Sequence, residues 1–423
     1  MKMKKHLILS MLLLGFAGML EAENVQRTLP DVVEGVRDEV ISLNGEWQFQ
    51  YAPGEKWERV TVPGELAMQG YGIEHDKPVL YKKTVLVPAD YRGKQVILRF
   101  DGVYSYARLW VNGKQAAEHA GGFTRWETDI TSLIRIGKKN EIRLEVTDRL
   151  NDISYASGYA HHPIGGILRG VSLYALPESN MRDFFVETLL DDAYQDADLR
   201  IVYSMSASAK VSFTLKEKKS GRVCLESGVL ACQQGDNEHR FRISRPELWD
   251  AEHPNLYVLQ VNVQSADGGY SFEREIGFRK IEVKGDRMLV NGKQVKLRGA
   301  CRHDIHPTLG RTSTPELDSL DAVLFKRANM NFVRTSHYPP TESFLKYCDR
   351  EGIYVECETA VWILTVRRIM LPERVRMIRK LLPSIWVSWK RWSLLPVLML
   401  PCFSGRSVTN PFMERTSSCR MTG

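Results

Sequence analysis

Long apolar runs, metal-binding cysteine patterns and compositional bias are all missing from this 423-residue chain. No apolar run reaches the roughly 20 residues that a membrane-spanning helix needs, which excludes a polytopic membrane protein. No CxxC pair or zinc-type cysteine spacing occurs, so the common zinc folds are excluded as well. The chain is 43% hydrophobic and 26% charged, which excludes collagen and a disordered chain. Its length predicts two to four domains.

The positive charge of the chain is confined to its end. The formal net charge is +7, from 58 basic and 51 acidic residues. Residues 363–423 hold 11 of the basic and 2 of the acidic residues, a net of +9, so the first 362 residues have a net of −2. The folded part therefore lacks the basic character that would favour a nucleic-acid partner.

The N-terminus has the layout of a secretory signal peptide. Lys2, Lys4 and Lys5 precede an apolar run over residues 7–20, and the small residue Ala22 follows. The alternative is a membrane anchor, but the run is shorter than a bilayer span. We expect cleavage of residues 1–22, a secreted or periplasmic protein, and no stable membrane anchor.

Seven cysteines are present, an odd number with scattered spacing. Cys224 and Cys232 lie close enough in sequence to pair across a hairpin in an oxidising compartment. The other interpretation is that they are small buried hydrophobic residues. The sequence leaves both open.

Two successive β-sandwiches are predicted before residue 284. In residues 23–180, Val96, Leu98 and Phe100 alternate as in a half-buried strand, and Asn112-Gly113 is a hairpin signal. This segment predicts a jelly roll. Residues 181–283 predict an immunoglobulin-like sandwich. Its clearest strands lie at 199–203, 211–215, 239–243, 256–263 and 271–276.

Residues 284–362 change to an alternation of strand and helix. Strands are predicted at 295–297, 331–334 and 353–357. Thr314 and Thr341 are the N-caps of the two helices between them. Leu317, Leu320 and Leu324 form one stripe on the first helix; Phe344, Leu345 and Cys348 face inward on the second. This is the opening of a (β/α)₈ barrel, which needs eight such units. Strand 353–357 is expected to be an unpaired edge.

Polar side chains follow each of the three predicted barrel strands. The first is followed by RGACRHDIHP at 298–307, the second ends in RTSHYP at 334–339, and Glu358 follows the third. Strand ends converge in a barrel, so these groups can hydrogen-bond a polyhydroxy ligand and stabilise developing charge. A single histidine here is more simply a satisfied loop residue, but the whole group favours a site.

The same segments resemble glycoside hydrolase family 2, the β-galactosidase and β-glucuronidase family. The resemblance extends upstream to LNGEW at 43–47, GGILR at 165–169, LW at 248–249, PNLY at 254–257 and GFR at 277–279. It covers about residues 40–362. The RHDIHP motif at residues 302–307 resembles β-galactosidases more than β-glucuronidases.

The resemblance implies a retaining mechanism with two glutamates about 5 Å apart. The family places the acid/base in a Gly-Asn-Glu motif after the fourth strand and the nucleophile further on, and neither motif is present here. We therefore predict no catalytic residue and no metal ligand in this chain. The predicted substrate-binding residues are His303, Asp304, Arg334, His337 and Glu358. Some family members use magnesium or sodium, so either ion is expected only in the intact parent.

The basic tail is explained by a shifted reading frame. If the last base of each codon is read with the first two of the next, some residue pairs have forced products, among them Trp386-Val387, which gives Gly, Trp389-Lys390, which gives Glu, and Met413-Glu414, which gives Gly. Residues 403–414 then permit Phe-Trp-Ser-x-Gly-Asn-Glu-Ser-x-Tyr-Gly, which contains the family's acid/base motif. The hypothesis is a frameshift between about residues 360 and 364. The alternative is a true basic tail that binds membrane or nucleic acid.

The predicted function is hydrolysis of terminal β-galactosides by the intact parent, with this chain itself inactive. The alternatives are a β-glucuronidase or β-mannosidase of the same family, or a non-catalytic carbohydrate-binding protein using Trp47, Trp57, Trp110 and Trp126. The expected partner is a β-linked glycan, and the intact parent is expected to be a homo-oligomer.

Overall fold

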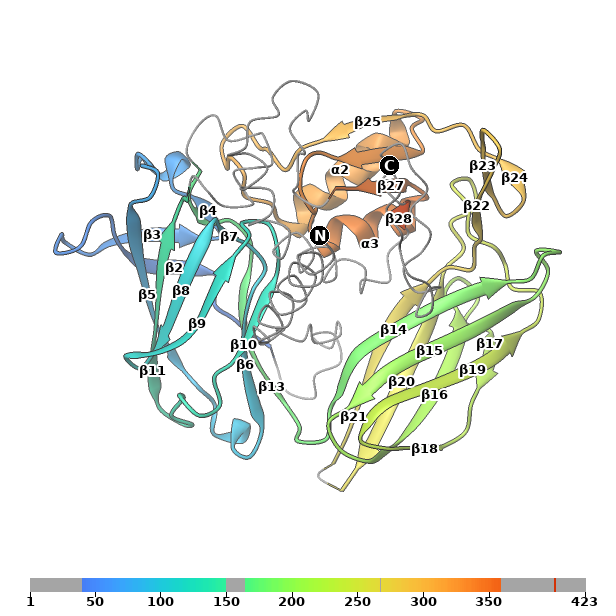
Figure 1. Ribbon diagram of the computed structural model, residues 1–423, viewed down its shortest axis with the longest axis horizontal. Helices are drawn as coiled ribbons and strands as arrows, with labels where there is room; N and C mark the ends of the chain where they lie inside the picture. Colours follow the sequence, from blue (N-terminus) through green and yellow to red (C-terminus); the bar gives the residue numbers. More distant parts are fainter. Residues whose placement is uncertain (1–39, 150–163, 267, 359–398, 401–423) are drawn as a thin grey trace, which may run out of the picture.

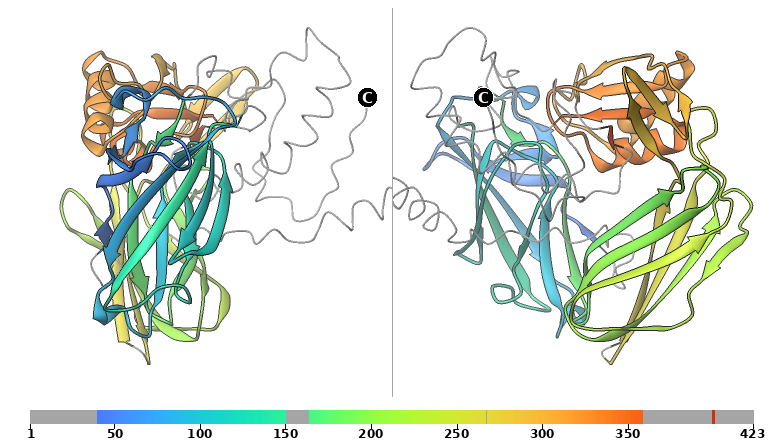
Figure 2. Two further views of the ribbon diagram at one scale, coloured as in Figure 1. Left: turned by 90° about the vertical axis from the view of Figure 1, so that its left-hand side faces the viewer. Right: turned by 45° about the vertical axis from the view of Figure 1, so that its right-hand side comes forward.

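The computed structural model describes residues 40–149, 164–266, 268–358 and 399–400. Two β-sandwiches stand side by side, and a small α/β segment lies across one end of both (Figures 1 and 2). The predicted signal peptide at 1–22 and nearly all of the tail at 363–423 lie outside the described residues.

The first sandwich is the predicted jelly roll, built from antiparallel strands. Its smaller main sheet runs β1 (Ile41–Ser42), β13 (Val171–Leu176), β6 (Gln95–Phe100), β10 (Trp126–Asp129). Its larger sheet runs β3 (Glu58–Val62), β2 (Gly45–Gln50), β5 (Pro78–Leu86), β11 (Lys139–Thr147), β8 (Tyr106–Val111), β9 (Lys114–Ala120). A third sheet runs β4 (Gly64–Glu65), β12 (Gly166–Ile167), β7 (Val103–Tyr104), and single 3-10 turns form at η2 (Ala67–Gln69) and η3 (Ala89–Tyr91).

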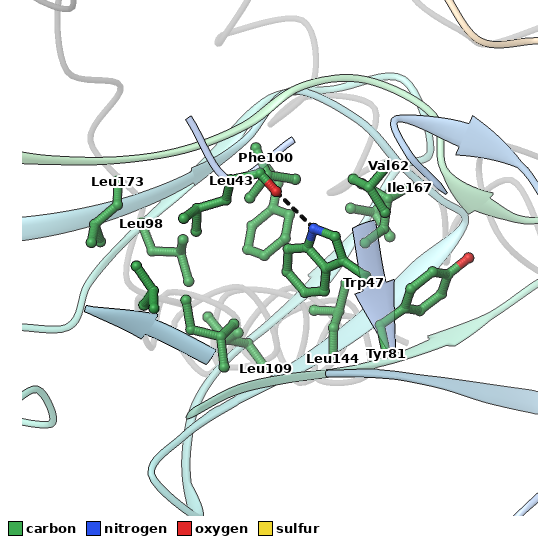
Figure 3. Close-up of a cluster of buried hydrophobic side chains, with 14 of the residues drawn as sticks. Leu43, Trp47, Val62, Tyr81, Leu98, Phe100, Leu109, Leu144, Ile167 and Leu173 are labelled. Carbon is green, nitrogen blue, oxygen red and sulfur yellow. Dashed lines mark hydrogen bonds between the residues drawn. The ribbon is translucent and has the colours of Figure 1, made fainter. Parts of the chain in front are cut away.

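Alternating apolar residues fill the space between the jelly-roll sheets, as predicted. Trp47 is 1% exposed and lies among leucine, valine and aromatic side chains from both sheets (Figure 3). Its indole Nε1 donates to the carbonyl oxygen of Leu43 at 2.7 Å, so the buried polar atom is satisfied. The Asn112-Gly113 hairpin is confirmed: both residues have positive φ, 51° and 81°, between β8 and β9.

The second sandwich confirms the predicted immunoglobulin-like domain. One sheet runs β14 (Met181–Leu190), β15 (Ala197–Met205), β19 (Gly235–Ile243); the other runs β17 (Val223–Glu226), β16 (Ala209–Glu217), β20 (Tyr257–Ser265), β21 (Gly268–Ile276), with β18 (Leu230–Cys232) also paired to β16. Cys224 and Cys232 are free thiols here, and Cys232 is buried, so the disulfide alternative is wrong and the buried-hydrophobe interpretation fits Cys232.

The third part begins with a small antiparallel sheet and continues as a parallel one. The small sheet is β22 (Ile281–Lys284), β23 (Arg287–Val290), β24 (Lys293–Gln294). The parallel sheet and its helices follow as β25 (Gly299–Arg302), α2 (Pro315–Arg327), β26 (Phe332–Thr335), α3 (Glu342–Glu351), β27 (Tyr354–Cys357) and β28 (Met399–Leu400). Both threonine N-caps are confirmed, and α3 buries Phe344, Leu345 and Cys348 as predicted. The boundary predicted at residue 283 falls inside β22.

Three details of this part were predicted wrongly. The first strand is Gly299–Arg302 instead of 295–297, because Val295 and Leu297 pack beside the second sandwich's Trp249. On α2, Leu320 and Leu324 are about half exposed and Asp318 is fully buried.

The third correction concerns the sheet edge at β27. Strand β28 pairs with it in parallel, Val355 opposite Met399 and Glu356 opposite Leu400, so this edge is not unpaired.

A buried carboxyl lies between the second sandwich and the barrel segment. Burial raises the pKa of Asp349 to about 7, although the charge of Arg279 opposes the shift. Next to it, Nε1 of Trp249 donates to the carbonyl oxygen of Asp349 at 2.8 Å. The protonated acid is therefore the form that this interface accommodates best.

The stability of the protein is expected to fall with rising pH because of Asp349. The folded-state pKa of Asp349 is about 7, above the usual ~4 of an unfolded aspartate. The contribution of this carboxyl to the free energy of unfolding is therefore complete below pH ~4 and is lost as the pH rises through about 7. In Asp349→Asn, the free energy of unfolding should decline less between these two pH values. Urea unfolding measured at a series of pH values gives this free energy. The exposed Asp286→Asn is the matched control and should leave the decline unchanged. An equal decline in Asp349→Asn and wild type would contradict the prediction.

Candidate functional site

Three parallel strands bring the predicted polar residues to one edge of the sheet. In register, Cys301 of β25 lies opposite Arg334 of β26, and Thr335 lies opposite Cys357 of β27. The carboxyl ends of the strands therefore coincide, and His303, His337 and Glu358 follow directly from them. This is where active sites form in parallel α/β folds.

Glu358 is held by two cationic or polar neighbours at this edge. One carboxylate oxygen pairs with Nη2 of Arg334, and the other lies 3.1 Å from Nδ1 of His337. Its backbone N–H donates to Oγ1 of Thr335 at 3.2 Å. The Glu358 side chain is only 16% exposed, so the pairing with Arg334 is partly shielded from solvent. The carboxylate is thus fixed in one orientation.

The two predicted histidines lie beside each other. The rings of His303 and His337 are 5.5 Å apart between centroids. Burial lowers the pKa of His303, and the neighbouring His337 and Arg311 lower it further. A neutral imidazole can both donate and accept a hydrogen bond, which suits hydroxyl groups.

Arg334 also contacts a thiol that the sequence did not single out. Its Nη1 lies 3.6 Å from Sγ of Cys301, which is exposed. Burial opposes the charge of Arg334, but the contacts with Cys301 and Glu358 raise its pKa overall. Only the parallel register identifies Cys301, because nothing in its sequence context distinguishes it from the other cysteines.

Asp304 is placed apart from these four residues. It is 5% exposed, and its two carboxylate oxygens are engaged by Arg302 and, at 2.9 Å, by Nη2 of Arg169. Both carboxylate oxygens of Asp304 are thus engaged inside the protein, and its predicted contact with substrate stays a prediction. Its position follows from Arg302, which points inward and pairs with Asp318 at 2.8 Å as well.

The jelly roll contacts the loops that carry the site. Arg169 donates from Nη1 to the carbonyl oxygen of Phe123 at 2.8 Å and from Nη2 to that of Pro339 at 2.7 Å. The rings of Phe123 and Tyr338 stack at 3.8 Å between centroids, with Tyr338 next to His337 in sequence. The site is thus built on two domains, which sequence analysis of the barrel segment did not reveal.

The described residues contain no group of three or more histidine, cysteine, aspartate or glutamate side chains arranged to hold a metal ion. In the same part of the chain, no helix is long and apolar enough to cross a membrane. The arrangement of Arg334, His337, Glu358 and His303 can position a ligand through hydrogen bonds. It does not contain two carboxyl groups spaced for glycoside hydrolysis.

Three family models match successive parts of the chain. They are described as the sugar binding domain of glycosyl hydrolases family 2 (residues 36–177), glycosyl hydrolases family 2 (179–279) and the TIM barrel domain of the same family (281–374). The last match ends at residue 374, beyond the frameshift junction predicted at 360–364.

Curated relatives are β-galactosidases. The chain is 31% identical over 370 residues to one from Priestia megaterium and 30% identical over 373 residues to one from Photobacterium profundum. These alignments cover 75% and 77% of this chain but 36% of each relative. The chain therefore spans about a third of the length of these relatives.

Solved structures with the same fold include β-glucuronidases. One from Parabacteroides merdae has a TM-score of 0.69 at 24% identity and covers 77% of this chain and 47% of its own. One from Dictyoglomus thermophilum has a TM-score of 0.67 at 23% identity, with 78% and 60% covered. Three domain matches in order, with β-galactosidase relatives and a shared fold, establish the identity: this chain is a member of glycoside hydrolase family 2.

Proposed function

We propose that the intact parent of this chain is a retaining β-glycosidase that hydrolyses terminal β-galactosides. The observation that carries the proposal is the fixed group of Arg334, His337 and Glu358 at the ends of the parallel strands. The β-galactosidase relatives support the choice of sugar. Export by a cleaved signal peptide and assembly into a homo-oligomer belong to the same proposal, as does any use of magnesium or sodium by the parent.

The described residues bind and orient the sugar in this mechanism. Glu358 accepts hydrogen bonds from hydroxyl groups, and Arg334 and His337 donate to them while keeping the carboxylate in place. The neutral His303 takes either role. The acid/base and the nucleophile, two carboxyl groups about 5 Å apart, come from later strands of the parent's barrel.

A neutral sugar suits this pocket better than a uronic acid. A glucuronate carboxylate needs an available cation, and Arg334 is already paired with Glu358. The β-glucuronidase alternative is favoured only by the solved structures, which share the fold. No observation favours a β-mannosidase.

The alternative of a non-catalytic carbohydrate-binding protein depends on four jelly-roll tryptophans that would stack on sugars. Trp47 and Trp126 are buried in the jelly-roll core. Trp57 and Trp110 are half buried, and their rings are covered by the charged ends of Lys82 at 4.3 Å and of Arg143 at 5.4 Å. Trp47 and Trp126 therefore offer no platform for sugar stacking, and one face of Trp57 and of Trp110 already has a cation over it.

A substrate panel tests the choice of sugar. The parent, encoded with the frame restored after residue 362, is expected to hydrolyse an aryl β-galactoside at least tenfold faster than the corresponding β-glucuronide or β-mannoside, compared as kcat/KM. The reason is that Arg334, the cation at the described strand ends, is already paired with Glu358. A parent that prefers the glucuronide would overturn the proposal and favour the alternative.

The frameshift is tested at the nucleotide level. We expect the gene, read from the last base of each codon across codons 363–423, to encode Gly-Asn-Glu with the glutamate at the junction of codons 409 and 410. Sequencing the gene and its transcript decides the matter, and any other sequence at this junction removes the hypothesis.

A further inference from the structure

Arg169 of the jelly roll is a buried cation between the two barrel loops that carry the histidines of the site. Its side chain is 5% exposed. Nη2 donates to the carbonyl oxygen of Pro339 at 2.7 Å and to Oδ2 of Asp304 at 2.9 Å. Asp304 directly follows His303 in the chain, and Pro339 comes two residues after His337. One guanidinium group therefore holds both loops.

Tyr338 links the same two loops from the barrel side. Its hydroxyl oxygen accepts from the backbone N–H of Asp304 at 3.0 Å and from Nη1 of Arg311 at 2.9 Å. Its ring stacks on Phe123 of the jelly roll at 3.8 Å between centroids. Nη1 of Arg169 donates to the carbonyl oxygen of the same Phe123 at 2.8 Å. The guanidinium group and the stacked ring thus attach the loops to one point of the jelly roll.

The jelly roll leaves room for the Arg169 side chain at Gly102. A Cβ atom on Gly102 would lie 3.0 Å from Cδ of Arg169 and 3.2 Å from its Cγ, which is closer than carbon atoms ordinarily pack. The backbone N–H of Arg169 also donates to the carbonyl oxygen of Gly102 at 3.3 Å. The side chain is therefore confined, and its planar guanidinium group, with donors in fixed directions, determines where its acceptors lie.

The spacing of the polar groups at the strand ends depends on these two loops. The rings of His303 and His337 are 5.5 Å apart between centroids, and Nδ1 of His337 lies 3.1 Å from Oε2 of Glu358. A shift of the loop that carries His337 changes both distances. Because hydrogen bonds weaken steeply away from their preferred distance and angle, misplaced groups would bind the hydroxyl groups of a sugar less well.

We propose that Arg169 is a positioning residue of the strand-end site, which sets the distance between His303 and His337 and thereby the affinity of the site for its sugar. Its Nη atoms donate to acceptors of the protein, so it acts through the two loops. The statement about affinity rests on the proposed glycosidase function. The statement about spacing does not, because the described residues alone produce it.

The 423-residue chain tests the spacing without any assay of hydrolysis. Burial lowers the pKa of His303, and the charge of His337 lowers it further. His337→Gln should therefore raise the pKa of His303, measured by NMR of the ring Cε1–H signal across pH. In an Arg169→Met background the same replacement should raise it by about half as much or less, because the two rings are no longer held at their distance.

Arg125→Met is the matched control for this comparison. Arg125 joins the same two domains by pairing with Glu342, the first residue of α3, and its side chain is 15% exposed. In this background, His337→Gln should shift the pKa of His303 as much as in the wild type. An undiminished shift in Arg169→Met, an equal reduction in Arg125→Met, or no shift in any background would each overturn the proposal.

Kinetics of the frame-restored parent test the effect on affinity. Arg169→Met should raise KM for an aryl β-galactoside about tenfold and change kcat by less than about threefold, because the lost interactions serve binding. A merely unfolded fraction would lower kcat and leave KM unchanged. Arg169→Lys should restore little, since a single ammonium group does not reproduce the planar fork. Arg125→Met should keep the wild-type KM.

The outcomes separate this inference from the proposed function. An unchanged KM in Arg169→Met, or an equal rise in Arg125→Met, would overturn the role of Arg169 in affinity. A wild-type parent that does not hydrolyse the galactoside would contradict the proposed function instead, and the NMR comparison would still decide whether Arg169 sets the spacing of the two histidines.

Discussion

The 423-residue chain is expected to hydrolyse an aryl β-galactoside no faster than buffer, whereas the frame-restored parent should exceed that rate by at least ~10⁶-fold. The physical reason is that binding residues alone do not supply the two carboxyl groups that protonate the leaving oxygen and attack the sugar. Arg334, His337 and Glu358 are already engaged with one another at the strand ends. Release of the aryl alcohol from both purified proteins measures the difference.

The control for this comparison is the parent with its junction glutamate changed to glutamine. It retains the fold and the sugar contacts, and it should lose activity by at least ~10²-fold because its general acid is gone. Measurable hydrolysis by the 423-residue chain, retained after further purification, would contradict both the inactivity and the assignment of the catalytic pair to later strands.

Arg302→Met is expected to destabilise the barrel segment by about 3–5 kcal/mol, the cost of leaving buried charges without their partner. Arg302 is 6% exposed and pairs with three carboxylates: Asp304, Asp318 at 2.8 Å and Asp321 at 2.7 Å. Methionine fills a similar volume but leaves the buried carboxylates of Asp304 and Asp318 short of a cation. Urea unfolding followed by intrinsic fluorescence measures the loss.

Arg327→Met is the matched control for this variant. Arg327 lies at the exposed end of α2, so its replacement should change the free energy of unfolding by less than about 0.5 kcal/mol. The same small change in Arg302→Met would mean that the network around Asp318 contributes little. It would then leave the burial of Asp318 on α2 unexplained.

Periodicity and turn signals predicted the two sandwiches because they are local properties. The alternation at Val96, Leu98 and Phe100 and the Asn112-Gly113 turn each depend on a few neighbouring residues. The same holds for Thr314 and Thr341, whose side chains accept from the backbone N–H three residues on.

The errors arose where contacts distant in sequence competed with local pattern. The stripe of Leu320 and Leu324 predicts an inward helix face, but Asp318 is drawn inward instead by Arg302 and by the hydroxyl groups of Ser313, Thr341 and Ser343. Asp304 belongs to a motif that resembles substrate-binding segments, and Arg169 from another domain donates to one of its oxygens, a contact that no local pattern indicates.

The sequence by itself determined the family, the order of the domains and the convergence of His303, Arg334, His337 and Glu358, because motifs and strand periods are encoded in neighbouring residues. Only the tertiary structure decided which side chains remain available to a ligand. Both oxygens of Asp304 take part in buried ion pairs, and Glu358 is fixed by Arg334 and His337. Hydrogen-bond capacity depends on groups brought together from distant segments, and no local pattern records those pairings.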